Sequence, residues 1–212
     1  MKIIHILSGG LDSTVLLYKL IEEGHKIKCL SFDYGQRHKK ELQMAIKTCK
    51  KLNIEHKIVD ITSINELLQG SSLTSLNIEI PEGHYQEEGM RNTVVPNRNM
   101  IFASLAIGYA VSLDYDAFSL GVHKGDHHIY PDCRPIFIHR LEEVLRVANY
   151  EPIMIITPFL NMNKKEIVKE GIKLNVDFSL TWTCYKGEDN PCGKCGSCIE
   201  RIEAFRLNGV KE

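Results

Sequence analysis

Four cysteines near the end of the chain are spaced as metal ligands. They follow the pattern C-x7-C-x2-C-x2-C and are Cys184, Cys192, Cys195 and Cys198. Two C-x2-C pairs that share one cysteine bring three thiolates together from a single tight loop, and the fourth thiolate can complete a tetrahedron. Four thiolates favour zinc, and a filled tetrahedral site has no open position for a catalytic water. The spacing therefore predicts one structural Zn²⁺ per chain.

An iron–sulfur cluster is the alternative for these cysteines, because C-x2-C-x2-C also occurs in ferredoxin-type runs. Such runs place a further cysteine just beyond, usually before a proline, whereas Ile199 and Glu200 follow Cys198 in this chain. Cys29, in a predicted strand, and Cys49, on an apolar helix face, are interpreted as core residues.

A second group of residues has the composition of a phosphate-binding loop. It lies between the first predicted strand and the first predicted helix and consists of Ser8, Gly9, Gly10, Leu11, Asp12, Ser13 and Thr14. The glycines let the backbone approach an anion, and a helix start supplies unpaired N–H groups and the positive end of a dipole. The loop lacks the ending of a Walker loop and is not the six-residue dinucleotide fingerprint. If the two glycines are considered alone, a plain turn before a capped helix is the alternative.

Three further polar segments lie near the predicted ends of strands or helices. Residues 32–38 follow the second predicted strand, residues 95–99 open a long helix, and residues 125–135 follow the fourth strand. In a parallel sheet, all three lie with the phosphate loop at the edge formed by the carboxyl ends of the strands. Each segment alone could be a solvated turn or a helix cap. Their convergence favours one ligand site.

Alternating strand and helix patterns predict the elements that position these residues. The predicted strands are Lys2–Leu7, Ile27–Phe32, Ile54–Asp60, Ala117–Gly121 and Ile153–Thr157. The predicted helices are Ser13–Glu23, Glu41–Leu52, Asn99–Leu113, Ile136–Asn149, a helix that starts at Asn163, and Ile199–Leu207. The less regular residues 61–95 are expected to carry one short helix.

Strands separated by helices imply right-handed crossovers and a parallel sheet. We therefore predict a Rossmann-like α/β domain over residues 1–180, with helices on both faces of the sheet. A small C-terminal zinc-binding lobe over residues 181–212 would complete a single compact unit.

Charge and composition limit the classes of partner. The chain has 212 residues, with 26 Lys and Arg against 27 Asp and Glu, so it has no basic excess for nonspecific binding to nucleic acid. The longest near-apolar stretch, residues 101–111, is about half a membrane span, and the N-terminal apolar run is too short for a signal peptide. We expect a cytoplasmic protein that binds neither membranes nor nucleic acid.

Taken together, the motifs resemble those of a known family. The Ser-Gly-Gly-x-Asp-Ser string in its strand–loop–helix context is similar to the PP-loop ATP pyrophosphatases. The added segments at residues 32–38, 95–99 and 125–135 and the cysteine pattern resemble the 7-cyano-7-deazaguanine synthase (QueC) family in particular. The resemblance extends from about Ile3 to Phe205, which is nearly the whole chain.

The resemblance implies an ATP-dependent carbon–nitrogen ligase. Enzymes of that family convert 7-carboxy-7-deazaguanine, ammonia and ATP into the nitrile 7-cyano-7-deazaguanine, a queuosine precursor, through an acyl-adenylate and an amide. The partners would thus be small molecules. Mg²⁺ is implied on the ATP phosphates in addition to the structural Zn²⁺, and a homodimer is allowed.

The same resemblance implies roles for individual residues. The ATP-binding residues would be Phe32 and the loop of residues 8–14. The catalytic residues would be Asp12, His38 and Arg98. The substrate-binding residues would be Gln36, Asn99, Tyr130, Asp132 and Arg134. A carboxylate such as Asp132 can accept from the N1–H and amino groups of a guanine-like ring, and a guanidinium such as Arg134 can pair with a carboxylate or carbonyl.

The sequence departs from the family at Ile136, where family members commonly have an acidic residue. A ligase that uses an amine other than ammonia is therefore an alternative. A PP-loop enzyme that modifies tRNA is another, but it requires a metal-free catalytic cysteine pair and a basic surface, and the net charge is −1. A non-enzymatic module that binds zinc and nucleotide is a third alternative. Asp12, His38, Arg98 and Arg134 offer more chemistry than such a module needs.

Overall fold

The first strand of the chain lies in the middle of a parallel sheet. A computed structural model describes residues 1–37, 39–84 and 88–210. Its five-stranded sheet has the order β3-β2-β1-β4-β5, and every neighbouring pair is parallel. The strands are β1 (Lys2–Ile6), β2 (Lys26–Asp33), β3 (Glu55–Asp60), β4 (Ala117–Ser119) and β5 (Met154–Ile156). The chain therefore adds β2 and β3 on one side of β1 and then β4 and β5 on the other side.

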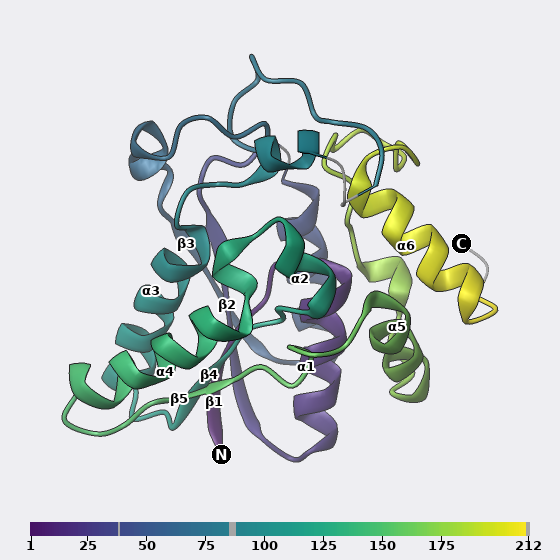
Figure 1. Cartoon of the computed structure of the whole chain (residues 1–212). Coiled ribbons are helices and arrows are strands. Elements are labelled where there is room, and N and C mark those ends of the chain that lie inside the picture. The colour runs from purple at the N-terminus through teal and green to yellow at the C-terminus, as the bar shows by residue number, and fades with distance from the viewer. Residues whose placement is uncertain (38, 85–87, 211–212) are drawn as a thin grey trace.

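Helices cover both faces of the sheet (Figure 1). They are α1 (Leu11–Glu22), α2 (Lys40–Leu52), α3 (Arg98–Ser112), α4 (Pro135–Ala148), α5 (Lys164–Lys173) and α6 (Gly196–Leu207). Helices α3 and α4 share one apolar core with the sheet, whereas α1, α2 and α5 share the core on the opposite face. Helix α6 packs on α5. The prediction of a Rossmann-like sheet with helices on both faces is confirmed.

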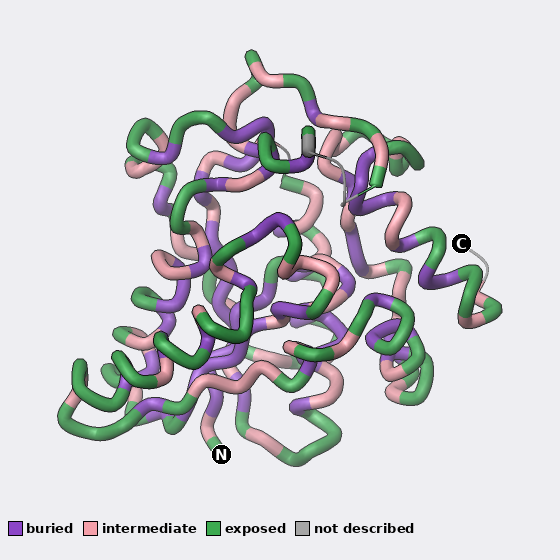
Figure 2. The backbone as a smooth tube through the Cα atoms, viewed as in Figure 1, coloured by how far each residue is buried: buried purple, intermediate pink, exposed green. Residues whose placement is uncertain are grey.

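Burial explains why these residues form these elements. Four of the five residues of β1 are buried, as expected for a central strand covered by helices on both faces. The alanines at 103, 106 and 110 form a buried face of α3 and let that helix approach the sheet closely. Figure 2 shows the buried backbone concentrated along β1 and the helix surfaces that face it.

The connection between β3 and α3 differs from the prediction. It contains two short 3₁₀ helices, Thr62–Leu67 and Glu88–Thr93, so the expectation of one short helix was wrong. This connection extends to the C-terminal segment, where Glu82 forms an antiparallel bridge with Cys195 and the amide of Gly83 donates to the carbonyl of Lys194 at 3.0 Å. Two segments far apart in the sequence are thus joined at the top of the molecule in Figure 1.

Most element ends lie within a few residues of their predicted positions. The largest shift that affects the site is at α6, which begins at Gly196 instead of Ile199 and therefore includes Cys198. The capping box predicted at the start of α5 is present, since Asn163 accepts from the amide of Glu166 and Glu166 accepts from the amide of Asn163. None of the helices in the described part of the chain has the length and apolar character needed to cross a membrane.

Candidate functional site

A cleft opens at the carboxyl ends of the central strands. It encloses about 200 Å³ and is lined by residues that follow β1, β2 and β4, by the start of α3, and by the segment before the cysteine loop. Strands β1 and β4 are neighbours, but the chain leaves them toward opposite edges of the sheet. Parallel sheets bind ligands at this kind of crevice.

The phosphate loop forms one side of the cleft. Its N-cap residue is Gly10, and no side chain caps helix α1, so the amides of the first turn are available to an anion. The Ser8 and Ser13 hydroxyl oxygens lie 2.9 Å apart, and the Thr14 hydroxyl donates to the Gly10 carbonyl at 2.8 Å. These bonds hold the loop in an open curve around the helix start.

A buried histidine contacts this loop from the adjacent strand β1. The two ring nitrogens of His5 lie 2.8 Å from the Ser119 hydroxyl and 2.9 Å from the Ser13 carbonyl. Burial lowers the pKa of His5 to about 4, so the ring is neutral at neutral pH. His5 thereby ties β1 and β4 to the first turn of α1.

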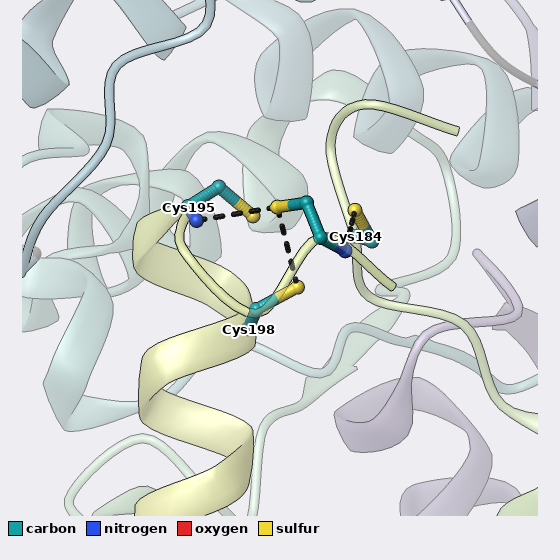
Figure 3. A group of neighbouring side chains, drawn as sticks. Cys184, Cys195 and Cys198 are labelled. Carbon is teal, nitrogen blue, oxygen red and sulfur yellow. Dashed lines mark hydrogen bonds between the residues drawn. The ribbon is translucent and has the colours of Figure 1, made fainter. Parts of the chain in front are cut away.

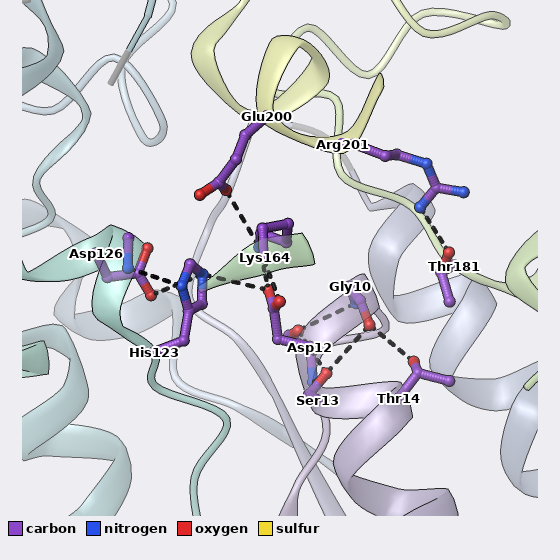
Figure 4. Close-up of polar contacts among 12 residues, drawn as sticks. Gly10, Asp12, Ser13, Thr14, His123, Asp126, Lys164, Thr181, Glu200 and Arg201 are labelled. Carbon is purple, nitrogen blue, oxygen red and sulfur yellow. Dashed lines mark hydrogen bonds and ion pairs between the residues drawn. The ribbon is translucent and has the colours of Figure 1, made fainter. Parts of the chain in front are cut away.

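Five ionisable side chains from distant parts of the chain meet beside the loop (Figure 4). The Lys164 ammonium lies 2.7 and 2.8 Å from the two Asp12 carboxylate oxygens and 3.3 Å from Glu200. The His123 Nε2 atom lies 3.8 Å from Asp12 and 3.5 Å from Asp126. We call these residues, Asp12, His123, Asp126, Lys164 and Glu200, the charged cluster.

The pKa values of the charged cluster follow from burial and from its one lysine. Burial alone would lower the pKa of Lys164, but Asp12 and Glu200 outweigh burial and raise it. Burial alone would raise the pKa of Asp12, but Lys164 and His123 lower it. Desolvation lowers the pKa of His123 to about 3 and raises that of Asp126 to about 7. The cluster thus combines a fixed ion pair with a carboxyl group that titrates near neutral pH.

The stability of the ligand-free protein should depend on pH through Asp126. Its folded-state pKa of about 7 lies above the ordinary value of 3.8, so the folded protein holds this proton more tightly than the unfolded chain. The resulting stabilisation is present at low pH and is lost as pH rises from about 4 to about 7. The Asp126→Asn variant lacks this titrating group, so its stability should not fall in the same way. The free energy of unfolding of the variant minus that of the unmodified protein should therefore increase between about pH 5 and 7 and then level off. Urea unfolding across this range measures the difference, and a constant difference would contradict the assignment.

Aromatic side chains and Arg98 form another part of the wall. The rings of Phe32 and Phe102 stack with centroids 4.3 Å apart, and the Arg98 guanidinium lies 6.0 Å from the Tyr34 ring centroid. Burial alone would lower the pKa of Arg98, but nearby groups, first Tyr34 and then Asp132, raise it. Flat apolar surface beside a fixed positive charge suits a planar ring that carries a carboxylate.

The structure brings most of the predicted site residues to the cleft. Those that line it are Ser8, Gly10, Leu11, Asp12, Ser13, Phe32, Gln36, Arg98, Asn99 and Tyr130. Gly9 and Thr14 do not line it. The carbonyl of Gly9 accepts from the amide of Trp182, and the hydroxyl of Thr14 donates to the carbonyl of Gly10. Gln36 binds the amide of Tyr34 and the carbonyl of Phe32, which shapes the turn after β2. His38 lies outside the described residues.

Two predicted substrate residues do not line the cleft. The Asp132 carboxylate accepts from the amide of Asn99 at 3.0 Å, so it binds the first turn of α3. The Arg134 side chain is exposed, and its Nε donates to the carbonyl of His127 at 2.8 Å. Direct contact of these two residues with the guanine-like ring of the expected substrate therefore stays a prediction.

Sequence reasoning missed several residues that the structure brings to the site. Lys164, Glu41 and Asp126 line the cleft, and His123 and Glu200 complete the charged cluster. The signals for Lys164 and Asp126 were indirect. Lys164 directly follows the predicted helix start at Asn163, and Asp126 lies within the polar segment at residues 125–135.

The four cysteines form a site that could hold a metal ion (Figure 3). Their sulfur atoms all lie within 4.8 Å of one another, and the Sγ atoms of Cys192 and Cys198 are 3.9 Å apart. The amide of Cys192 donates to the sulfur of Cys184, and the amide of Cys195 donates to the sulfur of Cys192. A tetrahedral site with metal–sulfur bonds of about 2.3 Å has sulfur atoms roughly 3.8 Å apart, and N–H donors stabilise thiolates, so the donor set fits a metal ion.

Trp182 connects the cysteine loop to the phosphate loop. Its amide donates to the carbonyl of Gly9 at 3.0 Å, and its indole N–H donates to the carbonyl of Cys184 at 2.9 Å. The ammonium of Lys40 lies 4.6 Å from the ring centroid. The backbone and the side chain of one buried residue therefore link the two loops.

Known proteins are similar to this chain over its whole length. Residues 2–209 match the model of a family described as queuosine biosynthesis protein QueC. A relative from Psychromonas ingrahamii, named 7-cyano-7-deazaguanine synthase, is 54% identical over 211 residues, which cover 100% of this chain and 96% of the relative. A relative of the same name from Hahella chejuensis is 56% identical over 211 residues, covering 100% of this chain and 91% of the relative.

Solved structures with low identity share the fold. The U34-tRNA thiolase NcsA from Methanococcus maripaludis, described with its 4Fe-4S cluster, has a TM-score of 0.54 and 16% identity and covers 100% of this chain and 74% of the thiolase. At this identity, the likeness supports a common α/β architecture and nothing about the metal.

Proposed function

Because the chain belongs to the QueC family, whose matching relatives are named 7-cyano-7-deazaguanine synthases, we propose that it converts 7-carboxy-7-deazaguanine and ammonia into 7-cyano-7-deazaguanine with ATP. The protein is an enzyme. The observation that carries the proposed chemistry is a phosphate loop beside the buried Asp12–Lys164 ion pair, at the crevice where parallel sheets bind ligands. The relatives' names do not favour the tRNA-modifying alternative.

The first proposed step is adenylation of the substrate carboxylate. An oxygen of the carboxylate attacks the α-phosphorus of ATP, and pyrophosphate leaves with the electrons of the broken P–O bond. The open first turn of α1 and the ammonium of Lys164 would stabilise the negative charge on the phosphates. No side chain needs to become a nucleophile, so catalysis rests on positioning and electrostatics.

The walls of the cleft would orient the two substrates. We assign Phe32 to the adenosine and Arg98 to the charge of the carboxylate or α-phosphate. Asn99, Gln36 and Tyr130 would border the deazaguanine. Asp132 would act on that ring through the first turn of α3, and Arg134 would act from the rim. His38 completes the proposed catalytic set.

Two metals belong to this proposal. Mg²⁺ would enter with ATP and neutralise its phosphates, and the carboxylates of Asp12 and Asp126 are hard oxygen ligands that could hold it. Zn²⁺ would fill the four-cysteine site and stabilise the cysteine loop.

The acyl-adenylate would next react with ammonia to give an amide and AMP. The amide oxygen would then attack the α-phosphorus of a second ATP and release pyrophosphate. Breakage of the C–O bond, with the oxygen leaving in AMP and the two N–H protons passing to solvent, would give the nitrile. The same cleft would serve both stages, because each stage places a substrate oxygen against an α-phosphate. We class the enzyme as a carbon–nitrogen ligase on this basis.

We expect AMP and pyrophosphate as the nucleotide products. The loop lacks the lysine of a Walker loop, and its glycines and open helix start suit a pyrophosphate group. Incubation with 7-carboxy-7-deazaguanine, ATP, Mg²⁺ and ammonium, followed by nucleotide separation and mass spectrometry, should detect AMP together with the nitrile. ADP and free phosphate without AMP would contradict adenylation. AMP with an amide conjugate formed only from another amine would support the alternative ligase.

We expect one zinc ion per chain and no iron. Cys195→Ser removes one thiolate, and it should lower both the bound zinc and the stability, because binding energy at a structural site contributes to folding. Elemental analysis and thermal unfolding measure the two effects. Cys49→Ser is the matched control, since Cys49 is buried in the main core and should leave the zinc content unchanged. Normal folding of Cys195→Ser with full zinc content would overturn the four-cysteine assignment.

A further inference from the structure

Glu41 places a carboxylate in the cleft, where the charge of Arg98 acts on it, but no hydrogen bond or ion pair to it occurs within the described residues. It lies in the first turn of α2, it is half-buried, and it lines the cleft. Of the other two carboxylates that line the cleft, Asp12 pairs with Lys164 at 2.7 Å, and Asp126 lies 3.5 Å from the ring of His123. Among the residues that the structure describes, none forms a hydrogen bond or ion pair with the carboxylate of Glu41. A carboxylate in this setting is prepared for a cationic or N–H ligand.

The position of Glu41 limits which ligand it would contact. The backbone of its helical turn lies directly against Gly9 of the phosphate loop. In the proposed adenylation, the bond between a carboxylate oxygen and the α-phosphorus forms beside this loop, so Glu41 would be close to the reacting centre. In the proposed function, the deazaguanine ring would extend away from that centre, along Gln36, Asn99 and Tyr130.

We propose that Glu41 binds the ammonium ion and accepts its proton, so that ammonia forms next to the acyl-adenylate. This proposal rests on the proposed function, in which ammonia is the attacking amine. Ammonium is the cationic form of that substrate and has no lone pair, so it must lose a proton before attack. Burial raises the pKa of Glu41 to about 7, although the nearby Arg98 acts to lower it; Asp12 and Cys184 act in the same direction as burial. A pKa near 7 is suitable for a base that works at neutral pH.

The proposed step is balanced in atoms and charge. One proton passes from ammonium to a carboxylate oxygen of Glu41. The nitrogen lone pair then forms the C–N bond, and the C–O bond to the phosphate breaks with its electron pair leaving on AMP. The new amide nitrogen releases a second proton to AMP or water. Glu41 later returns its proton to solvent, and neither oxidant nor reductant is required.

Glu41→Gln tests this assignment because it removes the base and keeps the size of the side chain. We expect pyrophosphate exchange into ATP, driven by 7-carboxy-7-deazaguanine, to stay within about threefold of the unmodified enzyme. The kcat/KM for ammonium at neutral pH should fall by about 100-fold, the range of general base catalysis. Glu66→Gln is the matched control, since Glu66 is exposed and outside the cleft.

Hydroxylamine separates proton removal from other effects. It is largely unprotonated at neutral pH, so it does not need a base before it attacks. Glu41→Gln should therefore form the hydroxamate at close to the rate of the unmodified enzyme, and Glu41→Asp should recover part of the activity with ammonium. The limb of the ammonium pH profile near the pKa of Glu41 should also be lost in Glu41→Gln.

Three results would overturn the proposal. Equal losses with ammonium and hydroxylamine would indicate a structural role, and unchanged activity with ammonium would exclude a base. Loss of pyrophosphate exchange with a raised KM for 7-carboxy-7-deazaguanine would instead indicate that Glu41 binds the amino group of the deazaguanine ring. If the unmodified enzyme adenylates its substrate but uses no ammonium, the proposed function itself fails, and this proposal fails with it.

Discussion

Lys164→Met should strongly reduce adenylation and strongly destabilise the protein. The lysine side chain is only 10% exposed and neutralises Asp12 and Glu200 at 2.7 and 3.3 Å. Its removal leaves buried carboxylates without a counter-charge, which costs about 3–5 kcal/mol when a buried pair is broken. The loss of a positive charge beside the phosphates should also lower kcat/KM for ATP by about 10³-fold. Urea unfolding and pyrophosphate exchange measure the two effects.

Matched variants distinguish the loss of the buried Lys164 charge from a general effect of replacing a lysine in helix α5. Lys173→Met changes a lysine of the same helix whose side chain is 64% exposed and pairs with Glu170 at the surface, so its cost should be about 1 kcal/mol or less. Adding Asp12→Asn to Lys164→Met removes one unpaired carboxylate and should restore part of the stability without restoring activity. A Lys164→Met protein as stable as the Lys173→Met control would contradict the importance of the buried pair.

Gly9→Ala should disrupt the phosphate loop. Gly9 has a φ of +88°, and a β-carbon built there would overlap the carbonyl oxygen of Glu41 and lie 2.9 Å from the amide of Ala45. Both neighbours are backbone atoms of α2, so either the loop or the helix must move. We expect ATP affinity to fall by at least about 100-fold, which corresponds to about 2.8 kcal/mol, and calorimetric titration of ATP measures it.

Gly24→Ala is the control that separates backbone strain from overlap. Gly24 has a φ of +76°, but a β-carbon there would meet no atom within 4 Å. This substitution should cost about 1–2 kcal/mol of stability for the left-handed conformation and leave ATP affinity unchanged. If Gly9→Ala bound ATP as tightly as Gly24→Ala, close packing between the loop and α2 would not matter for binding.

The architecture could be predicted because its signals are local. The buried strand at Lys2–Ile6, the glycine turn after it and the amphipathic helix Lys40–Leu52 each follow from neighbouring residues. Alternation of such elements then restricts the topology to a parallel sheet. The segment of residues 61–95 was harder, because it has no repeating apolar pattern and part of it, at Glu82, pairs with a residue more than a hundred positions away, Cys195.

The candidate site was predictable only where its residues are close in sequence. The phosphate loop and the cysteines are such cases. Lys164 meets Asp12 across 152 positions, and no spacing rule connects a lysine at a helix start to a loop that far away. Glu200, which sequence charge alone places among surface residues near the cysteines, instead points to the same ammonium. Asp132 shows why the sequence alone leaves some roles open. Its carboxylate could accept from a ligand or from a backbone amide at the start of a helix, and in the structure it accepts from the amide of Asn99.

The position of Trp182 makes the protein an optical reporter of its own two loops. It is the single tryptophan of the chain, so emission excited at the red edge of the absorption band comes from this indole alone. Its ring lies below the ammonium of Lys40, and its N–H contacts the carbonyl of Cys184. Both contacts alter the emission of an indole through charge and hydrogen bonding. Removal of the metal and arrival of a nucleotide should therefore each change the colour or intensity of the emission, without any attached dye.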